Sequence, residues 1–538
     1  MGRQENLLKL KDGSLFDLVV IGGGATGCGT ALDAATRGLK VALIEKNDFS
    51  EGTSSRSTKL VHGGVRYLEM AVKKLDKVQY KLVKDGLRER YILLKNAPHL
   101  SKRLPLVTPL YRWIDIPYIF AGLKLYDILS GKRNIGHSRL LKRKEALRRF
   151  PRLKAEGLKA GVLYYDGQFH DARMAVSLAL TAEQHGAAII NHVAVSGFLK
   201  EEGRISGVQL TDSLNGETWN LRARGVINAS GPFVDHVRWM DNPEAPKILS
   251  VSTGIHILLD KRFAPPDTGL MIPETEDGRV LFVLPWEGHA LVGTTDEPAN
   301  ISEHPKPLES EIDYLVRHVT RYFNLQVERS DVKSVWSGLR PLVSDPKAAD
   351  TAGLARDHII EESESGLQTI AGGKWTTYRK MAQDSVDQAI KLFSLYAPKP
   401  DCQTENLPIV GGADYNEKND LALIKKYAFD EDIASHLNQA YGDQAIKVSE
   451  LAAEGYGARL LEKHPILEAE VVYAVRHEMA ERIIDVLARR LSVALLDTES
   501  ARIAVPRVSE IMANELGWSK ERCKEEADLT EKRLTEAL

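Results

Sequence analysis

The segment 16–49, FDLVVIGGGATGCGTALDAATRGLKVALIEKNDF, constrains the fold more than any other part of this chain. Its composition predicts a β-branched strand, a glycine-rich turn, a helix that ends near Gly38, and a second apolar strand that ends at Glu45. Two strands joined by a helix form a βαβ unit, in which the strands are parallel. The sequence therefore predicts an α/β domain that begins near residue 16.

The glycine turn has the G-x-G-x-x-G spacing of a dinucleotide-binding motif. Gly22 permits a tight turn, Gly24 lets the backbone approach a pyrophosphate, and Gly27 lets the helix pack on the strand. The first helical turn, at Thr26, can offer N–H groups and a positive dipole end to the phosphates. Glu45 can accept hydrogen bonds from ribose hydroxyls, which argues against NADP. The motif alone leaves NAD and FAD open.

The next segment, 52–69, reads GTSSRSTKLVHGGVRYLE and distinguishes the two cofactors. A nicotinamide dehydrogenase has no obvious use for such a hydroxyl-rich, basic segment after its second strand. In a flavoprotein the segment can surround the pyrophosphate and the isoalloxazine with backbone and hydroxyl donors. We therefore predict FAD, with contacts from four residues of this segment: Thr53, Ser54, Ser57 and Lys59.

With these motifs in place, the chain resembles the FAD-dependent glycerol-3-phosphate dehydrogenases, which belong to the D-amino-acid-oxidase-like flavoproteins. Segment 21–38 matches the first signature of that family, and GGKWTTYRKMA at 372–382 is similar to its second. HGGVRYLE, TGIHI and SGLRPL occur in the expected order between or beside them. The resemblance covers essentially the whole chain. It implies oxidation of sn-glycerol 3-phosphate to dihydroxyacetone phosphate by hydride transfer from C2 to flavin N5, with electrons passed to ubiquinone or menaquinone.

The resemblance also implies further cofactor-binding residues. Val193 resembles the position at which the family lays backbone against the adenine, and Ala229 and Gly231 resemble a second FAD-contacting loop. Lys374 resembles a cation beside the flavin. Thr376, two residues later, can donate to the pyrimidine edge of the flavin.

A dianionic phosphate group needs cations, and two arginines are the first candidates. Arg66 and Arg340 each carry a planar guanidinium that can bind phosphate oxygens bidentately. Tyr67 adds a hydroxyl beside Arg66, and Lys374 adds a further positive charge. Arg340 can also stabilise the alkoxide that develops on the substrate.

A base must take the proton of the C2 hydroxyl, and His256 is the leading candidate. A lone histidine in an apolar strand is more often a core residue. The resemblance favours a role in the reaction, because the family places a substrate-facing histidine at this position. His62, in KLVHGG, is the second candidate and can equally bind the flavin or the substrate.

The pattern along the chain predicts an α/β + α architecture. A Rossmann-like FAD-binding domain is interleaved with a substrate domain built on a mixed or antiparallel sheet, and a linker leads to a helical C-terminal domain. The C-terminal domain can serve dimerisation or cap the catalytic part, so a homodimer stays open. The expected boundaries are 16–70, 155–235 and 345–396 for the FAD-binding domain, about 71–154 and 236–344 for the substrate domain, 397–413 for the linker and 414–538 for the helical domain.

The bulk composition excludes several classes of protein. The net charge of −2 gives no argument for nucleic acid as a partner. The three cysteines are too few and too scattered for a disulfide framework or a metal cluster, so we expect no metal and a reducing compartment. The N-terminus shows no signal peptide, and the chain has no apolar run of about 18 residues.

Charge is nevertheless distributed unevenly. Segment 102–154 holds 14 Lys or Arg residues and only three acids, and within it 111–129 is dense in aromatic and aliphatic residues. Such a surface can dip into an anionic bilayer, although a buried helix with a solvated basic face gives the same pattern. Together with the resemblance, this pattern predicts a peripheral protein on the inner, cytoplasmic face of the cell membrane. The expected contact residues are Trp113, Ile114, Tyr118 and Phe120.

Other functions remain open at this point. A glycerol-3-phosphate oxidase would pass electrons to oxygen, although such oxidases tend to be longer. A related flavin oxidoreductase could act on a 2-hydroxy acid or a D-amino acid. A non-catalytic flavin-binding or membrane-scaffolding protein is the third class, and the intact candidate residues at every expected site disfavour it.

Overall fold

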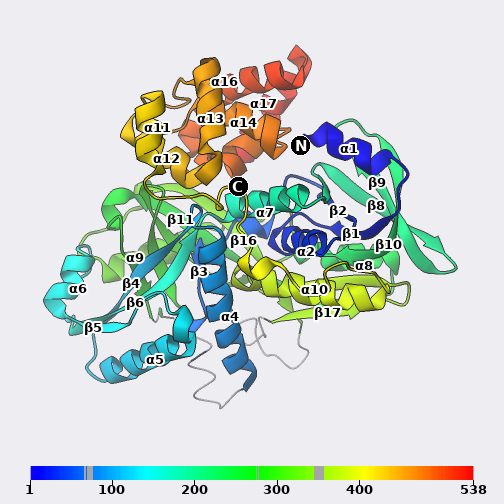
Figure 1. The fold of residues 1–538 in the computed structure, drawn as a ribbon. Coiled ribbons are helices and arrows are strands. Elements are labelled where there is room, and N and C mark those ends of the chain that lie inside the picture. The colour runs from blue at the N-terminus through cyan, green and yellow to red at the C-terminus, as the bar shows by residue number, and fades with distance from the viewer. Residues whose placement is uncertain are drawn as a thin grey trace.

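The computed structural model consists of two β-sheets with flanking helices and a helical C-terminal region above them (Figure 1). The residues it describes are 2–65, 68, 77–273, 275–276, 278–344 and 357–536. The predicted α/β + α fold is confirmed. No helix in these ranges is both long enough and apolar enough to cross a bilayer.

The first sheet is the predicted Rossmann-like sheet. Its central strands β10, β1, β2 and β7 are parallel neighbours, and β18 pairs in parallel with the outer side of β10. Strand β17 forms an antiparallel edge, while β8 and β9 extend β10 as an antiparallel ribbon. The strands are β1 Phe16–Ile21, β2 Val41–Ile44, β7 Ala188–Ile190, β8 Val193–Glu201, β9 Arg204–Asp212, β10 Thr218–Asn228, β17 His358–Glu362 and β18 Leu367–Gly372.

Both faces of the central strand β1 are buried, as expected of a parallel sheet. Leu18 and Val20 pack in the core that contains α2, and Val19 lies in a separate core on the opposite face. Helix α2 packs against α7 and α10. Its end is as predicted, because Gly38 follows it with a left-handed φ of +85°. The helices of this part are α1 Arg3–Lys11, α2 Ala25–Thr36, α7 Asp171–Gln184, α8 Val234–Asp241 and α10 Tyr378–Leu392.

The second sheet is mixed, as predicted. Strands β11, β13, β14 and β16 pair antiparallel, and β12 pairs in parallel with β4. The strands are β3 Leu60–Val61, β4 Ser101–Leu110, β5 Arg139–Lys142, β6 Ala160–Phe169, β11 Leu249–Asp260, β12 Gly269–Ile272, β13 Leu281–Trp286, β14 His289–Gly293, β15 Glu297–Pro298 and β16 Val332–Val343. The helices around it are α4 Lys77–Asn96, α5 Asp115–Ser130, α6 Arg143–Arg149 and α9 Glu309–Tyr322.

The second sheet corrects two predicted domain boundaries. Strand β6 pairs with β4 along its whole length, from Leu110↔Ala160 to Ser101↔Phe169, so the chain does not return to the first domain at residue 155. The return comes at α7, immediately after β6. Likewise β3 pairs with β6, so the chain leaves the first domain before residue 60 rather than at residue 70. Sequence patterns miss these positions because an apolar strand looks alike in either sheet.

The C-terminal region is helical, as predicted, and is joined to the first domain by buried ion pairs. Arg490 and Arg489 both donate to Asp48, which lies just after β2. Arg173 on α7 binds Glu478 with an Nη2–Oε1 distance of 2.7 Å. The helices are α11 Asn419–Tyr427, α12 Glu431–Tyr441, α13 Ala445–Leu451, α14 Glu468–Glu478, α15 Val493–Leu496, α16 Thr498–Leu516 and α17 Lys520–Thr535.

Candidate active site

The glycine turn between β1 and α2 is packed so closely that it excludes side chains. A Cβ on Gly22, whose φ is +107°, would lie 2.7 Å from the carbonyl oxygen of Ala229. A Cβ on Gly27 would lie 1.7 Å from the carbonyl oxygen of Gly22. Ala229 also donates its backbone N–H to Ile21, so the loop that contains Ala229 and Gly231 lies against the turn. The structure thus brings together two segments that were predicted to bind the cofactor.

The N-terminus of α2 has the geometry of an anion site. The backbone N–H of Ala25 donates to Ser54 Oγ at 2.9 Å, so Ser54 lies at the positive end of the helix. A Cβ on Gly24 would be 3.0 Å from the same oxygen, so Ser54 packs closely against the backbone of Gly24. Thr26 lies in the first turn, as expected.

Glu45 orders the turn through its carboxylate. It accepts hydrogen bonds from the backbone N–H groups of Gly23, at 2.5 Å, and Asn47, at 2.8 Å. Burial raises the pKa of Glu45 to about 7. The backbone of Glu45 also accepts from Val193, which places that residue beside the turn. Each carboxylate oxygen has further lone-pair sites, so the predicted acceptor role toward a ribose hydroxyl is compatible with these bonds.

The hydroxyl-rich segment 52–59 connects the second sheet with the start of α7. Thr53 Oγ1 donates to the backbone oxygen of Leu339 on β16, at 2.7 Å. Ser57 donates to Asp171 through both its backbone N–H and its hydroxyl, and Lys59 Nζ donates to the same carboxylate at 2.6 Å. The side chains of Thr53, Ser57 and Lys59 are engaged in bonds that hold the segment in place. These residues would therefore contact a cofactor mainly through their backbone groups.

Lys59 illustrates this point, because its ammonium group is fully buried. It lies over the rings of Trp286 and Trp336, at 5.1 and 5.4 Å. Burial lowers the pKa of Lys59, and the adjacent Asp171 opposes that shift.

Strands β11 and β16 bring the candidate base and a candidate phosphate ligand onto one face of the second sheet. Their register pairs Ser252 with Arg340 and His256 with Trp336, and residues two apart on a strand share a face. Arg340 extends over Gly254, where a Cβ would lie 2.1 Å from its Nη2. His256 and Arg340, predicted from separate motifs, are therefore neighbours.

His256 is buried and held on several sides. Its Nε2 is 2.8 Å from Thr58 Oγ1, and its ring stacks on Trp336 with a centroid distance of 5.4 Å. The absence of a side chain at Gly293 makes room for the ring, since a Cβ there would be 2.1 Å from His256 Cδ2. Burial, with Arg340 and Lys59 nearby, holds the pKa of His256 well below its ordinary value.

The guanidinium of Arg340 is fixed by four bonds within the second sheet. Nη1 donates to Asp296 Oδ1 and to the backbone oxygen of Thr253, each at 3.1 Å. Nη2 donates to Thr294 Oγ1 at 3.0 Å and to the backbone oxygen of Thr295 at 2.8 Å. These bonds orient the guanidinium and use all four of its Nη–H groups, so a phosphate bound at Nη1 or Nη2 would replace at least one of the present acceptors.

The second signature lies against segment 52–59. Trp375 donates its indole N–H to the backbone oxygen of Ser54 at 2.8 Å, and the backbone N–H of His62 donates to Thr376 Oγ1 at 3.3 Å. Lys374 precedes the short 3₁₀ turn Trp375–Thr377 that leads into α10. Trp375 and Ser54 are 321 residues apart in the chain and adjacent in the structure.

Two predicted substrate ligands, Arg66 and Tyr67, lie outside the described residues. Four residues of the site were not predicted from the sequence: Thr58, Asp171, Asp296 and Trp336. Thr58 stands within the hydroxyl-rich motif and could have been included with its neighbours. The other three carry no local signal, because their roles depend on contacts with distant segments.

A buried triad of Asp48, His192 and Asp485 has ligand atoms within 4.8 Å of one another. Arg489 donates to both carboxylates, so their charge is balanced by a cation of the chain itself. The triad is better explained as an ion-pair network than as a metal centre.

The arrangement around the glycine turn fits FAD. The turn leaves no space for side chains, Ser54 lies at a helix N-terminus, and His256 Nδ1 is a buried polar atom that finds no hydrogen-bond partner among the described residues. Such an atom is expected to gain a partner when the site is filled.

Comparison with known proteins identifies the family. A family model described as FAD dependent oxidoreductase matches residues 17–379, and one described as the C-terminal domain of alpha-glycerophosphate oxidase matches 402–523. The mitochondrial glycerol-3-phosphate dehydrogenase of Rattus norvegicus is 45% identical over 98% of this chain and 74% of its own length. The chain belongs to the FAD-dependent glycerol-3-phosphate dehydrogenase family.

Other relatives of the glycerol-3-phosphate dehydrogenase family agree. A probable mitochondrial enzyme of Dictyostelium discoideum is 47% identical over 98% of this chain and 84% of its own length. The crystal structure of the Bacillus halodurans glycerol-3-phosphate dehydrogenase complexed with FAD has a TM-score of 0.81 and 30% identity, and covers 99% of this chain and 97% of that one. An L-α-glycerophosphate oxidase from Mycoplasma pneumoniae, with a TM-score of 0.55 and 16% identity, shows the same fold over 73% of this chain and 98% of its own.

The predicted cofactor and enzyme class are thereby confirmed: this member of the family is an FAD-dependent oxidoreductase.

Proposed function

We propose that this enzyme oxidises sn-glycerol 3-phosphate to dihydroxyacetone phosphate and passes the electrons to a membrane quinone. The observation that carries the proposal is the placement of His256 and Arg340 on one face of β11 and β16, against segment 52–59. This face offers a proton acceptor and an anion ligand next to a dinucleotide-binding turn. Bound FAD supplies the two-electron oxidation of the substrate carbon.

His256 is the proposed base. Its lowered pKa keeps the imidazole neutral at neutral pH, so that one ring nitrogen can accept a proton. Thr58 holds the ring through Nε2, and Nδ1 is the atom to which we assign the proton of the C2 hydroxyl. His62 stays the second candidate for the base, and it can equally be a hydrogen-bond partner of the flavin or the substrate.

Arg340 is the proposed ligand of the substrate phosphate and of the developing alkoxide. Lys374, at the start of the second signature, adds positive charge near the flavin. We retain Arg66 and Tyr67 as proposed substrate ligands on the ground of their motif. Three cationic groups suit a phosphate dianion better than the single carboxylate of a 2-hydroxy acid.

Anaerobic stopped-flow spectroscopy of the yellow holoenzyme tests this proposal. Mixing with sn-glycerol 3-phosphate should bleach the oxidised flavin band within seconds, because no oxygen or quinone is needed for reduction. A 2-hydroxy acid and a D-amino acid at the same concentration should leave the band unchanged. If either of them bleaches the flavin faster than glycerol 3-phosphate does, the assigned substrate is wrong.

The electron acceptor separates two candidate functions. The match of residues 402–523 to the C-terminal domain of a glycerophosphate oxidase favours oxygen as the alternative to quinone. Reduced enzyme should be reoxidised faster by a short-chain ubiquinone or menaquinone than by air-saturated buffer. Faster reoxidation by oxygen, with stoichiometric peroxide, would assign the enzyme as an oxidase.

We also propose that the enzyme associates peripherally with the inner face of the cell membrane. Trp113 and Ile114 are each 69% exposed and Tyr118 is 52% exposed at the start of α5, which leaves large apolar side chains in contact with solvent. Phe120 differs from this prediction, because it is half-buried and packs against the core. Figure 1 shows α5 and the lower end of α4 on the side of the molecule opposite the C-terminal helices.

A further inference from the structure

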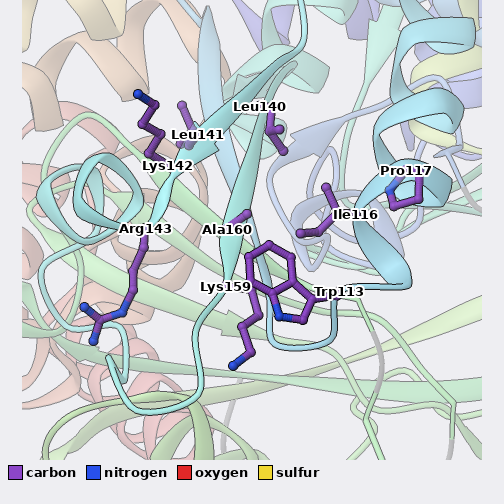
Figure 2. Close-up of a pocket in the computed structure, with 9 residues that line it drawn as sticks. All are labelled: Trp113, Ile116, Pro117, Leu140, Leu141, Lys142, Arg143, Lys159 and Ala160. Carbon is purple, nitrogen blue, oxygen red and sulfur yellow. The ribbon is translucent and has the colours of Figure 1, made fainter.

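A pocket of about 520 Å³ opens beside the first turn of α5, next to β5 of the second sheet (Figure 2). Its walls come from the turn before α5, from β5 and from the start of β6. Its lining includes Trp113, Ile116, Leu140, Lys142, Arg143 and Lys159. Its volume is within the range of about 300–1,000 Å³ that is usual for small-molecule sites.

The pocket is separate from the redox site. Ala160, which lines it, is the first residue of β6, whereas Asp171, which holds segment 52–59, follows the other end of that strand. A ten-residue strand spans about 33 Å. A ligand in the pocket would therefore not touch the groups assigned to catalysis.

The lining combines hydrocarbon surface with positive charge. Trp113 and Leu140 expose 69% and 46% of their surfaces, so a good part of the apolar wall faces solvent. Every charged residue that lines the pocket is a cation, and none is an acid. In Figure 2 the side chains of Arg143 and Lys159 point to the same side, away from Leu140, while Lys142 points in another direction.

Two of these cations are positioned by the protein. Arg143 donates through Nη2 to the backbone oxygen of Ala155 at 3.0 Å. The ammonium of Lys159 lies 6.0 Å from the centroid of the Trp113 ring, so one end of the pocket joins an aromatic surface to a positive charge. This pairing suits a molecule with a hydrocarbon chain and an anionic head.

We propose that this pocket binds one anionic phospholipid, with its phosphate beside Arg143 and Lys159 and an acyl chain along Trp113, Ile116 and Leu140. The choice of a lipid rests on the membrane association proposed above, and on the exposed apolar residues that flank the pocket, Ile114 and Tyr118. The surrounding segment 102–154, with 14 cations and three acids, favours an anionic over a zwitterionic head.

The test uses dihexanoyl phosphatidic acid below its critical micelle concentration, titrated into the holoenzyme and followed by calorimetry. One lipid should bind per chain. Lys159→Gln should weaken lipid binding about tenfold, because it removes a charged partner of the phosphate. Leu140→Gln should also weaken lipid binding, because it replaces an apolar contact of the acyl chain with a polar amide. Arg148→Gln is the matched control, since that cation is 79% exposed and outside the pocket, and should change affinity by less than about twofold. Flavin absorbance and the melting temperature of each variant verify its folding.

Three outcomes would overturn the proposal. Inorganic phosphate that binds as tightly as the lipid would make this an anion site without a role for hydrocarbon. Equal losses of lipid affinity in Lys159→Gln and Arg148→Gln would indicate that diffuse surface charge, and not the pocket, attracts the lipid. If the monomeric lipid does not bind at all, the pocket is not a lipid site. Flotation with anionic vesicles tests membrane association separately, so its failure is distinguishable from failure of the pocket.

Discussion

His256 shows how one residue can be both a core side chain and a candidate base. It stacks on Trp336 and bonds to Thr58, as a structural histidine would, yet its Nδ1 finds no partner among the described residues. A buried imidazole with cations nearby stays neutral, and a neutral imidazole accepts a proton. Its environment therefore supports the role that the sequence assigned by resemblance.

Replacing His256 with Asn tests this role. We expect the rate constant of flavin reduction by glycerol 3-phosphate to fall by about 10²–10⁴, the usual contribution of a general base. Anaerobic stopped-flow measures the rate, and the flavin content should equal that of the wild type. A reduction rate within a few-fold of the wild type would remove His256 from the mechanism.

The pH dependence of the same step follows from the lowered pKa of His256. The neutral, accepting form persists below the ordinary histidine pKa of about 6.5, so the rate constant at saturating substrate should stay level as pH falls through that value. The acid limb should begin only at lower pH. A half-maximal loss close to pH 6.5 would show that an unperturbed histidine controls the step.

Arg340 offers a second test at this scale. Arg340→Lys keeps the positive charge but loses the planar, bidentate geometry. We expect the KM for glycerol 3-phosphate to rise about tenfold or more, with FAD retained. Steady-state kinetics with the exposed substitution Arg148→Lys as a control should show whether the effect is specific to this site.

At the scale of elements, the pairing of β11 with β16 creates the face that carries His256 and Arg340, the proposed catalytic residues. The register sets Arg340 across Gly254, and the absence of a side chain there gives the guanidinium its place. Segment 52–59 crosses this face, with Thr53 donating to β16 and Ser57 donating to Asp171 at the start of α7. The geometry of the proposed catalytic residues thus depends on a glycine and on a loop as well as on the reacting side chains.

Gly254→Ala should separate geometry from stability. The new Cβ would lie 2.1 Å from Arg340 Nη2, the far end of a flexible side chain, so the guanidinium would move while the strand stays folded. We expect the KM for glycerol 3-phosphate to rise about tenfold, with little change in melting temperature. Gly197→Ala is the control, because its nearest neighbour would be 3.6 Å away. Unaltered kinetics in Gly254→Ala would contradict the assigned position of Arg340.

At the scale of the whole molecule, the C-terminal helices support the cofactor-binding domain from outside the site. Arg489 and Arg490 bind Asp48, three residues after Glu45, and all three charged groups are buried. Arg490 also donates to the backbone oxygen of Glu478, and Glu478 binds Arg173 on α7. The helical region is therefore coupled to the loop that follows β2, and with it to the glycine turn.

Arg490→Gln should destabilise the protein by about 3–5 kcal/mol, because it leaves a buried carboxylate short of a partner. We expect a lower melting temperature and faster release of FAD, followed by calorimetry and by flavin fluorescence. Arg507→Gln, which breaks ion pairs of a half-exposed arginine, should cost about 1 kcal/mol or less. Similar melting temperatures for the two variants would argue against coupling through Asp48.

Much of the structure of the first domain could be predicted from the sequence, because the spacing of glycines and apolar residues determines the local backbone conformation. The turn at Gly22, the helix end at Gly38 and the helical C-terminal region are all as predicted. The domain boundaries at 70 and 155 were wrong, since the pairing of β6 with β4 and β3 has no local signature. Phe120 was assigned to the surface from its neighbours, whereas packing of α5 turns it toward the core.

The sequence by itself determined the cofactor and the family, because these depend on motifs of a few residues with fixed spacing, and the same motifs supplied the proposed site residues. Only the tertiary structure decided that Thr58 bonds to His256, that Asp171 holds Ser57 and Lys59, and that Asp48 joins the C-terminal helices. These partners lie more than 100 residues apart along the chain. Their contacts depend on strand register and helix packing, which are properties of the folded chain as a whole.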